Sequence, residues 1–204
     1  YSGDGKFTSI HLTPRMIDII LENKEFTKMN FKYINFKYTD ITIFDHITEI
    51  IYDGHPSEFP KNIDKLSNLI SLTINSSTTK PIHLPQLPHL KKLIGLEINI
   101  EHIGGESLEE LEFGSGYIYP VDNLPNNLKK VTFKYHQYHP EYIHNLNILP
   151  ESIIELTLPC KFTCDIQKLP KNLKRININS KSPKLKHIYQ LCADSNIEVI
   201  ELTS

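Results

Sequence analysis

Apolar residues recur along this chain in one short phrase: an apolar residue, two others, an apolar residue, one other, and an apolar residue. The last three positions alternate with a period of two, which predicts a short β-strand. In residues 71–75, for example, Leu72 and Ile74 would point to the core and the residues that flank them would point the other way. The phrase occurs nine times, at Phe31/Ile34/Phe36, Ile47/Ile50/Tyr52, Leu69/Leu72/Ile74, Leu93/Leu96/Ile98, Leu108/Leu111/Phe113, Leu128/Val131/Phe133, Ile153/Leu156/Leu158, Leu173/Ile176/Ile178 and Ile197/Ile200/Leu202.

The spacing of these copies indicates how they are assembled. Their first anchors lie 16, 22, 24, 15, 20, 25, 20 and 24 residues apart. A strand this short buries almost no apolar surface by itself, and each copy therefore has to stack on its neighbours. A repeat of about 20–29 residues with this spacing is typical of a leucine-rich-repeat solenoid. We therefore predict an α/β-type leucine-rich-repeat solenoid, with short parallel β-strands in one curved sheet and irregular or short helical return segments.

A proline motif recurs between the predicted strands. Residues 124–128, 149–153 and 169–173 share the form Leu-Pro-x-x-Leu/Ile, and residues 59–63 are a variant of it. Proline fixes φ and favours an extended conformation in the residue before it, and the two polar residues that follow suit a tight turn. We expect these motifs to form the corners at which each return segment leads into the next strand.

Part of the chain resembles a known family. Within residues 108–133, the segments Leu-Glu-Phe-Gly-Ser-Gly-Tyr-Ile-Tyr-Pro and Leu-Pro-Asn-Asn-Leu-Lys-Lys-Val-Thr-Phe resemble one unit of the FNIP repeat, whose pattern is roughly L-x-F-G-x-x-F-N-x-P-I and then L-P-x-S-L-x-x-L-x-F. The Tyr-Ile-Tyr-Pro stretch lacks the family's asparagine, and the resemblance is weaker over residues 149–158 and 169–178. FNIP repeats are a leucine-rich-repeat variant found in social amoebae and in giant viruses of amoebae.

The resemblance implies a function as well as a fold. It implies a non-catalytic protein–protein interaction module, which could be the substrate-recognition part of a ubiquitin-ligase adaptor or take part in a virus–host interaction. A structural or self-assembling repeat protein is the alternative.

The two ends of the chain differ from the middle. Residues 13–22 predict a short helix, because a threonine can cap it and Pro14 suits the first helical position. We expect residues 1–28 to form an N-terminal cap with this helix, and residues 29–204 to form one solenoid of about nine FNIP-like leucine-rich repeats. Residues 182–192 have the same capping pattern, and we interpret them as a return helix within the last repeat because a strand follows.

Composition limits the classes of partner. The 204 residues carry a formal net charge of −2, which gives no general attraction to nucleic acid or to an anionic membrane. No apolar run approaches the roughly 18 residues that a membrane span needs. Three cysteines are few and odd in number, which favours a reducing compartment, so we expect a cytoplasmic location, in the host cytoplasm if the protein is viral. We expect a monomer whose partner is another protein.

Residues that could carry chemistry are few. His136, His139 and His144 could bind zinc if their loop folds back, although a long insert that exposes aromatic and histidine side chains is the simpler interpretation. Cys160 and Cys164 lack the second pair that a zinc site needs, and structural use of these cysteines is the simpler interpretation. We therefore expect no enzyme, no cofactor and no metal site, with a metal-dependent enzyme that uses the His/Tyr insert as the alternative.

The residues that flank each inward pair would line one face of the sheet, and we expect this face to bind the partner. Its acidic and basic zones would select that partner by charge. An ordinary solvated sheet face, with binding at a loop edge instead, is the alternative. The candidate face consists of Tyr33, Ile51, Thr73, Glu97, Glu110, Glu112, Lys130, Thr132, Lys134, Thr157, Arg175 and Asn177. The candidate loop edge consists of Tyr135, His136, Tyr138, His139 and Tyr142.

Overall fold

The computed structural model covers most of the predicted repeats. The helix predicted over residues 13–22 lies outside the part that the structure describes, apart from Asp18 and Glu22. Within the described part, no helix is long and apolar enough to cross a membrane. The structure describes residues 18, 22–25, 27–32, 41–53, 59–60, 62–75, 84–96, 105–134, 141–193 and 195–203.

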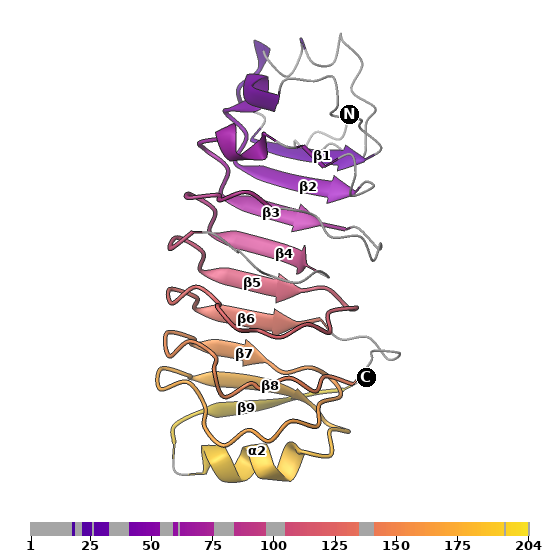
Figure 1. Cartoon of the computed structure of the whole chain (residues 1–204), viewed down its shortest axis with the longest axis vertical. Coiled ribbons are helices and arrows are strands. Elements are labelled where there is room, and N and C mark those ends of the chain that lie inside the picture. Colours follow the sequence, from indigo (N-terminus) through magenta and orange to yellow (C-terminus); the bar gives the residue numbers. More distant parts are fainter. Residues whose placement is uncertain are drawn as a thin grey trace.

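The described strands form one parallel sheet in which each strand pairs with the strands that precede and follow it in the sequence (Figure 1). A parallel neighbour can be reached only by a connection that crosses back, so a return segment joins each strand to the next. The result is a solenoid, as predicted. The nine strands are β1 (Lys28–Lys32), β2 (Glu49–Asp53), β3 (Ser71–Ile74), β4 (Lys92–Leu96), β5 (Glu110–Phe113), β6 (Lys130–Phe133), β7 (Glu155–Thr157), β8 (Arg175–Asn179) and β9 (Glu198–Leu202).

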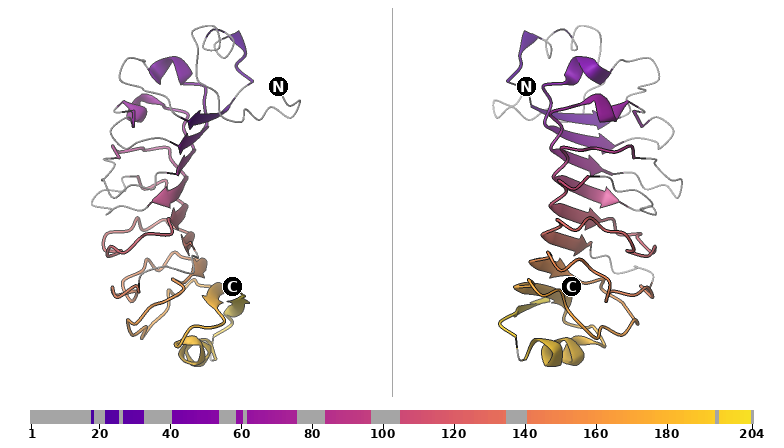
Figure 2. Two further views of the ribbon diagram at one scale, coloured as in Figure 1. Left: turned by 90° about the vertical axis from the view of Figure 1, so that its right-hand side faces the viewer. Right: turned by 60° about the vertical axis from the view of Figure 1, so that its left-hand side comes forward.

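The return segments of the central turns lie on one side of this sheet, and the sheet curves gently along the solenoid axis (Figure 2). Most of their described length is irregular, as the proline-rich sequence predicts. Apart from the helical residues Asp18 and Glu22, the described part has helices in three short stretches: η2 (Ile41–Phe44), η4 (Ile63–Lys65) and α2 (Leu185–Cys192). Helix α2 is the predicted return helix of the last repeat, because β9 follows it.

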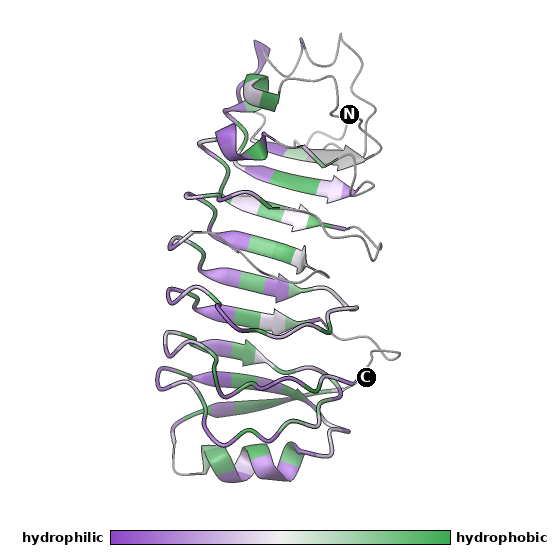
Figure 3. Cartoon of the chain, viewed as in Figure 1, coloured by the Kyte–Doolittle hydropathy of each residue, from purple (hydrophilic) through white to green (hydrophobic). Residues whose placement is uncertain are grey.

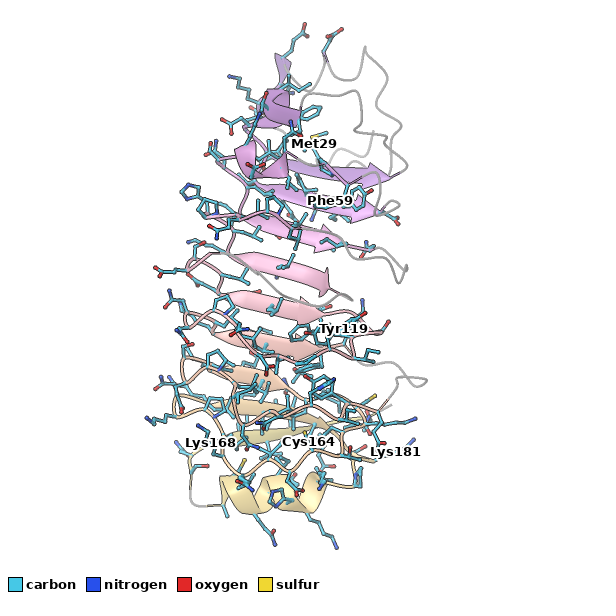
Figure 4. All side chains as sticks on the ribbon, in the orientation of Figure 1. Met29, Phe59, Tyr119, Cys164, Lys168 and Lys181 are labelled. Atoms are coloured by element: carbon cyan, nitrogen blue, oxygen red, sulfur yellow. The ribbon has the colours of Figure 1, made fainter. Side chains whose placement is uncertain are left out.

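An apolar column runs through the centre of the sheet. In Figure 3 most strands begin with a hydrophilic residue, in purple, and are green in their middle, where the hydrophobic residues lie. Burying one such side chain contributes about 1.5–3 kcal/mol, so the column is a main source of stability. Met29 and Phe59 belong to the same core (Figure 4), and the Phe59 ring meets the ring of Tyr52 edge-on with centroids 5.1 Å apart. The column consists of Ile50, Leu72, Leu93, Leu111, Val131, Leu156 and Ile176, which are in register on successive strands and at most 2% exposed.

The register of the first strand corrects the sequence-based prediction. Strand β1 pairs Met29 with Ile50 and Phe31 with Tyr52. Met29 therefore occupies the inward position that was predicted for Ile34, five residues further along. Apolar residues are dense here, so the spacing alone fits two frames, and only pairing with the next strand selects one.

The last strand is also shifted. Strand β9 pairs Val199 with Ile176, so Val199 and not Ile200 continues the apolar column. The shift places Glu201 opposite Ile178, at a position that is apolar in the other repeats. The Glu201 carboxylate accepts a hydrogen bond of 2.8 Å from the Tyr189 hydroxyl of α2, which satisfies it at the end of the sheet.

The fourth copy is shifted by three residues, and a glycine explains why. Strand β4 pairs Leu93 with Leu72, whereas the prediction gave Leu96 that place. The register slips by one residue at Gly95, which has a φ of +84°. A Cβ at Gly95 would lie only 2.1 Å from the Ile74 carbonyl oxygen, so only glycine allows this bulge.

The corners confirm the role predicted for the proline motif. In each motif the turn is closed by a backbone hydrogen bond from the apolar anchor back to the proline, three residues earlier. The polar residue before the anchor then ties the turn to the preceding repeat: Asn127 donates to the Glu106 carbonyl, and Ser152 donates to the Leu128 carbonyl at 2.7 Å. The turn-closing bonds run from Leu128, Ile153 and Leu173 to Pro125, Pro150 and Pro170, at 3.3, 3.3 and 3.1 Å.

Candidate binding face

The outer face of the sheet, opposite the return segments, carries one residue at the centre of each strand, and we call these residues the middle row. Apart from Glu112 they are short polar or aliphatic residues. The prediction named six of its members, and they occupy equivalent register positions on their strands. Two further predicted face residues, Tyr33 and Glu97, lie outside the described residues, and the row contains Ile94 and Ile200 that the prediction missed. From β1 to β9 the middle row is Asn30, Ile51, Thr73, Ile94, Glu112, Thr132, Thr157, Asn177 and Ile200.

A second row on the outer face lies at the start of the strands, and we call it the charged row. Its signs alternate from strand to strand, with one neutral residue at β3. Glu110, Lys130 and Arg175 were predicted for the face, and Lys134 lies exposed just beyond β6. From β1 to β9 the charged row is Lys28, Glu49, Ser71, Lys92, Glu110, Lys130, Glu155, Arg175 and Glu198.

Ion pairs connect neighbouring members of the charged row. Opposite charges directly across neighbouring strands attract, whereas like charges at the same place would repel. These side chains are between a quarter and three-fifths exposed, so each pair contributes only a few tenths of a kcal/mol up to about 1 kcal/mol. The nitrogen–oxygen distances are 2.5 Å for Lys28–Glu49, 3.0 Å for Lys92–Glu110, 2.8 Å for Lys130–Glu155, 3.8 Å for Arg175–Glu155 and 2.8 Å for Arg175–Glu198.

The charged row has a sequence signal that can be read once the repeats are aligned. The two residues between the first and second apolar anchors of each repeat form a doublet, and the second member of the doublet joins the row. The charge of that member changes sign from one repeat to the next. The doublets are Lys91-Lys92, Glu109-Glu110, Lys129-Lys130, Ile154-Glu155, Lys174-Arg175 and Ile197-Glu198.

Ion pairing shifts the pKa of Arg175 in the row and of Glu109 beside it, in each case toward the ionised form. The hydrogen bond to Glu198, its charge, and the charge of Glu155 raise the pKa of Arg175 further above its ordinary value. On the corner beside the row, the Lys129 ammonium donates to Glu109 at 2.9 Å and lowers the pKa of that carboxyl. The row contains four cations and four anions, so the row has an ordered charge pattern without a net charge.

The predicted loop edge is placed only in part, since Tyr135, His136, Tyr138 and His139 lie outside the described residues. Tyr142 is not at an exposed edge: its side chain is 1% exposed, and its hydroxyl donates to the Tyr119 carbonyl at 3.1 Å. Burial, the nearby Cys164 thiol and Asp122 raise the pKa of the Tyr142 phenol well above its usual range. Tyr142 is therefore a core residue and not a candidate for contact with a partner.

The position of Tyr142 also locates the insertion in this repeat. Tyr142 forms a parallel bridge with Phe162, which marks the two as equivalent residues of successive turns. Tyr117 is buried like both of them, and it precedes Tyr142 by 25 residues, whereas Phe162 follows Tyr142 by 20. The five additional residues therefore fall before Tyr142, in the stretch that contains His136 and His139.

No group of three histidine, cysteine, aspartate or glutamate side chains that could hold a metal ion occurs within the described residues. The Nε2 atom of His144 lies 2.7 Å from the Ile118 carbonyl oxygen, which can only accept, so this nitrogen carries the proton. Burial raises the pKa of the Cys164 thiol (Figure 4) and of the Cys192 thiol, which disfavours the reactive thiolate. These residues serve the packing of the return segments.

A shallow groove with a volume of about 410 Å³ follows the corner at the start of the central strands. Lys91, Glu109 and Lys129 line it together with the exposed Ile154. Three of its polar side chains, those of Ser107, Asn127 and Ser152, already donate hydrogen bonds to backbone carbonyls. The groove thus borders the candidate face and is too open to enclose a small molecule.

Comparisons with known proteins add little to this description. Neither a protein-family model nor a curated protein sequence matches the chain. The architecture is a leucine-rich-repeat-type solenoid, as the repeat length and the strand pairing of this chain require. A solved structure described as "The crystal structure of CroV588 a novel circular LRR protein structure" is similar, with a TM-score of 0.48 and 18% sequence identity. The alignment covers 88% of this chain and 34% of that one, so this chain spans about a third of its length.

Proposed function

We propose that this chain is a non-catalytic protein-interaction module that binds another protein through the outer face of its sheet. The observation that carries the proposal is the pair of side-chain rows on that face, held in fixed register by backbone pairing along all nine strands. A repeat solenoid offers such an extended surface to a partner and has no built-in catalytic pocket. The return side, by contrast, is used to close the core.

The character of the face indicates how a partner would be chosen. The charges of the charged row balance, so attraction depends on a partner whose charges alternate in the complementary sense and not on the net charge of that partner. The half-buried aliphatic side chains of Ile51 and Ile94 in the middle row would supply the apolar contacts. Such a surface selects by pattern, which suits recognition of one protein among many.

The finer role follows from the resemblance of residues 108–133 to the FNIP repeat. On that basis the chain would recognise substrates for a ubiquitin-ligase adaptor, or a host protein if it is viral. Three free cysteines support a reducing location such as the cytoplasm. Both roles use the same face, so they share one structural test.

The test compares two arginine substitutions on opposite sides of the solenoid. Ile94→Arg alters the outer face, and Thr163→Arg places the same side chain at an exposed position of a return segment. Each variant and the unmodified chain would capture proteins from an amoebal lysate, and quantitative mass spectrometry would compare the captured sets. We expect one or more proteins to be retained by the unmodified chain and by Thr163→Arg but lost with Ile94→Arg. Equal retention by all three chains would show that the outer face is not the binding surface.

A further inference from the structure

The charged row has a symmetry that concerns a second copy of this chain. From β4 to β9 its signs read plus, minus, plus, minus, plus, minus without a break. An alternating series of even length is complementary to its own reversal. Two copies that face each other with their solenoid axes antiparallel can therefore place every charge opposite an unlike one.

A twofold axis parallel to the strands, passing between β6 and β7, generates this arrangement. Such an axis turns the two outer faces toward each other, keeps the strand directions the same and reverses the order of the repeats. Isologous interfaces of this kind use the same patch on both copies. The opposed charges are Lys92 with Glu198, Glu110 with Arg175, and Lys130 with Glu155.

The middle row matches under the same operation. Ile94 of one copy lies opposite Ile200 of the other, so the aliphatic side chains of the two copies contact each other. Thr132 lies opposite Thr157 next to the axis, where short side chains allow close approach. The remaining pair is Glu112 with Asn177, whose amide gives one N–H to the Thr157 hydroxyl at 3.0 Å and has a second N–H to donate to the carboxylate. No like charges meet in either row.

Other placements are less favourable. Moving the axis by one strand toward β5 brings Glu49 of one copy opposite Glu198 of the other, and these two carboxylates repel. Moving it by one more strand brings Glu49 opposite Glu155, which also repel. Moving the axis toward β9 keeps unlike charges opposite each other but shortens the overlap. The axis between β6 and β7 thus gives the longest contact without a repulsive pair.

We infer that the outer face from β4 to β9 is a homodimer interface, in which a second copy docks antiparallel with its axis between β6 and β7. The inference goes beyond the proposed function and does not rest on it, because it needs no other protein. The interface has six strands spaced about 4.8 Å apart, each with three outward residues. Together they cover on the order of 400 Å² per copy. An area of that size is at the low end of specific interfaces, so the dimer is weak and the chain is a monomer when dilute.

Sedimentation velocity of the purified chain tests the dimer, at concentrations from about 1 μM to about 1 mM, which brackets weak interfaces. We expect the mass to rise with concentration and the association to weaken with salt, because exposed charges are screened. The variant Thr132→Arg should raise the dissociation constant at least about tenfold, because the arginines of the two copies meet beside the axis. Thr163→Arg on the return side should leave it unchanged, and circular dichroism would confirm that both variants fold.

A zero-length crosslink tests the register. Within one chain Lys92 and Glu198 are five strands apart, about 24 Å, too far for a carbodiimide to join them directly. A Lys92–Glu198 crosslink in the dimer band is therefore expected only from the antiparallel arrangement. A chain that stays monomeric over the whole range, a Thr132→Arg variant that dimerises like the unmodified chain, or a dimer without this crosslink would each overturn the inference.

Discussion

Gly95 is the residue whose backbone conformation the sheet depends on most directly. Its φ of +84° suits glycine, and its missing Cβ leaves room for the Ile74 carbonyl. Gly95→Ala should therefore lower the free energy of unfolding by about 1–3 kcal/mol, as strained backbone positions do. Urea denaturation followed by circular dichroism would measure the loss.

A second glycine provides the control for that prediction. Gly116 is exposed and is not among the glycines with positive φ in the described residues, so Gly116→Ala should change the free energy of unfolding by less than about 0.5 kcal/mol. If the two alanine variants were equally stable, the bulge at Gly95 would not need a glycine.

His46 links the stability of the first described turns to pH. Its Nε2 atom is buried and meets no hydrogen-bond partner within the described residues. Burial, aided by the Lys24 ammonium and opposed by Asp45, lowers the pKa of His46 below its ordinary value of 6.5. The unfolded chain therefore binds this proton more readily than the folded chain, so its contribution to stability is lost as the pH falls below about 6.5.

The expected result is a difference between two titrations. The free energy of unfolding of the unmodified chain should fall more steeply between pH 7.5 and pH 5.5 than that of His46→Gln, which cannot be protonated there. Urea denaturation at several pH values would give both curves, and the other histidines cancel in the comparison. Parallel curves would mean that His46 keeps its ordinary pKa in the folded chain.

At the scale of elements, the alternating charges of the charged row stabilise the pairing of each strand with its neighbours. Glu110 on β5 lies between Lys92 on β4 and Lys130 on β6. Glu110→Lys would place three lysines side by side and should lower the free energy of unfolding by about 1 kcal/mol at low salt. The loss should shrink at high salt, which thermal or urea denaturation at two ionic strengths would show.

Two further variants separate charge order from charge number. Glu112→Lys makes the same change of charge in the middle row, where Ile94 and Thr132 flank it, and should cost less. Adding Lys92→Glu to Glu110→Lys restores one ion pair and should recover part of the loss. If Glu112→Lys costs as much as Glu110→Lys, the order of charges does not stabilise the sheet.

At the scale of the whole molecule, the described turns share one continuous apolar core between the sheet and the return segments, and the central column of the strands runs through it. Leu156 is 1% exposed and is packed between Val131 and Ile176 of the neighbouring strands. Leu156→Ala should therefore lower the free energy of unfolding by about 2–5 kcal/mol. Thr132→Ala on the outer face should change the free energy of unfolding by less than about 0.5 kcal/mol, and urea denaturation would measure both variants. A larger loss from Thr132→Ala than from Leu156→Ala would mean that the inward and outward faces are exchanged.

The sequence by itself determined the repeat architecture and most of the register. The alternation in Leu72 and Ile74, and the turns of the Leu-Pro-x-x-Leu motif, are local features that need no distant contact to be read. Their recurrence then requires neighbouring turns to stack. The inward positions of β2, β3, β5, β6, β7 and β8 were correct for this reason.

Only the tertiary structure decided the frames of β1, β4 and β9 and the pattern of the face. Several apolar residues compete at these three strands, and the choice among them is made by pairing with the next strand, by the bulge at Gly95 and by the polar contact of Glu201. The alternation of charge became visible only when Lys92 and Glu198 were aligned with the rest of the row. Residues about twenty positions apart in the chain acquire a shared electrostatic environment only when the strands that carry them lie side by side.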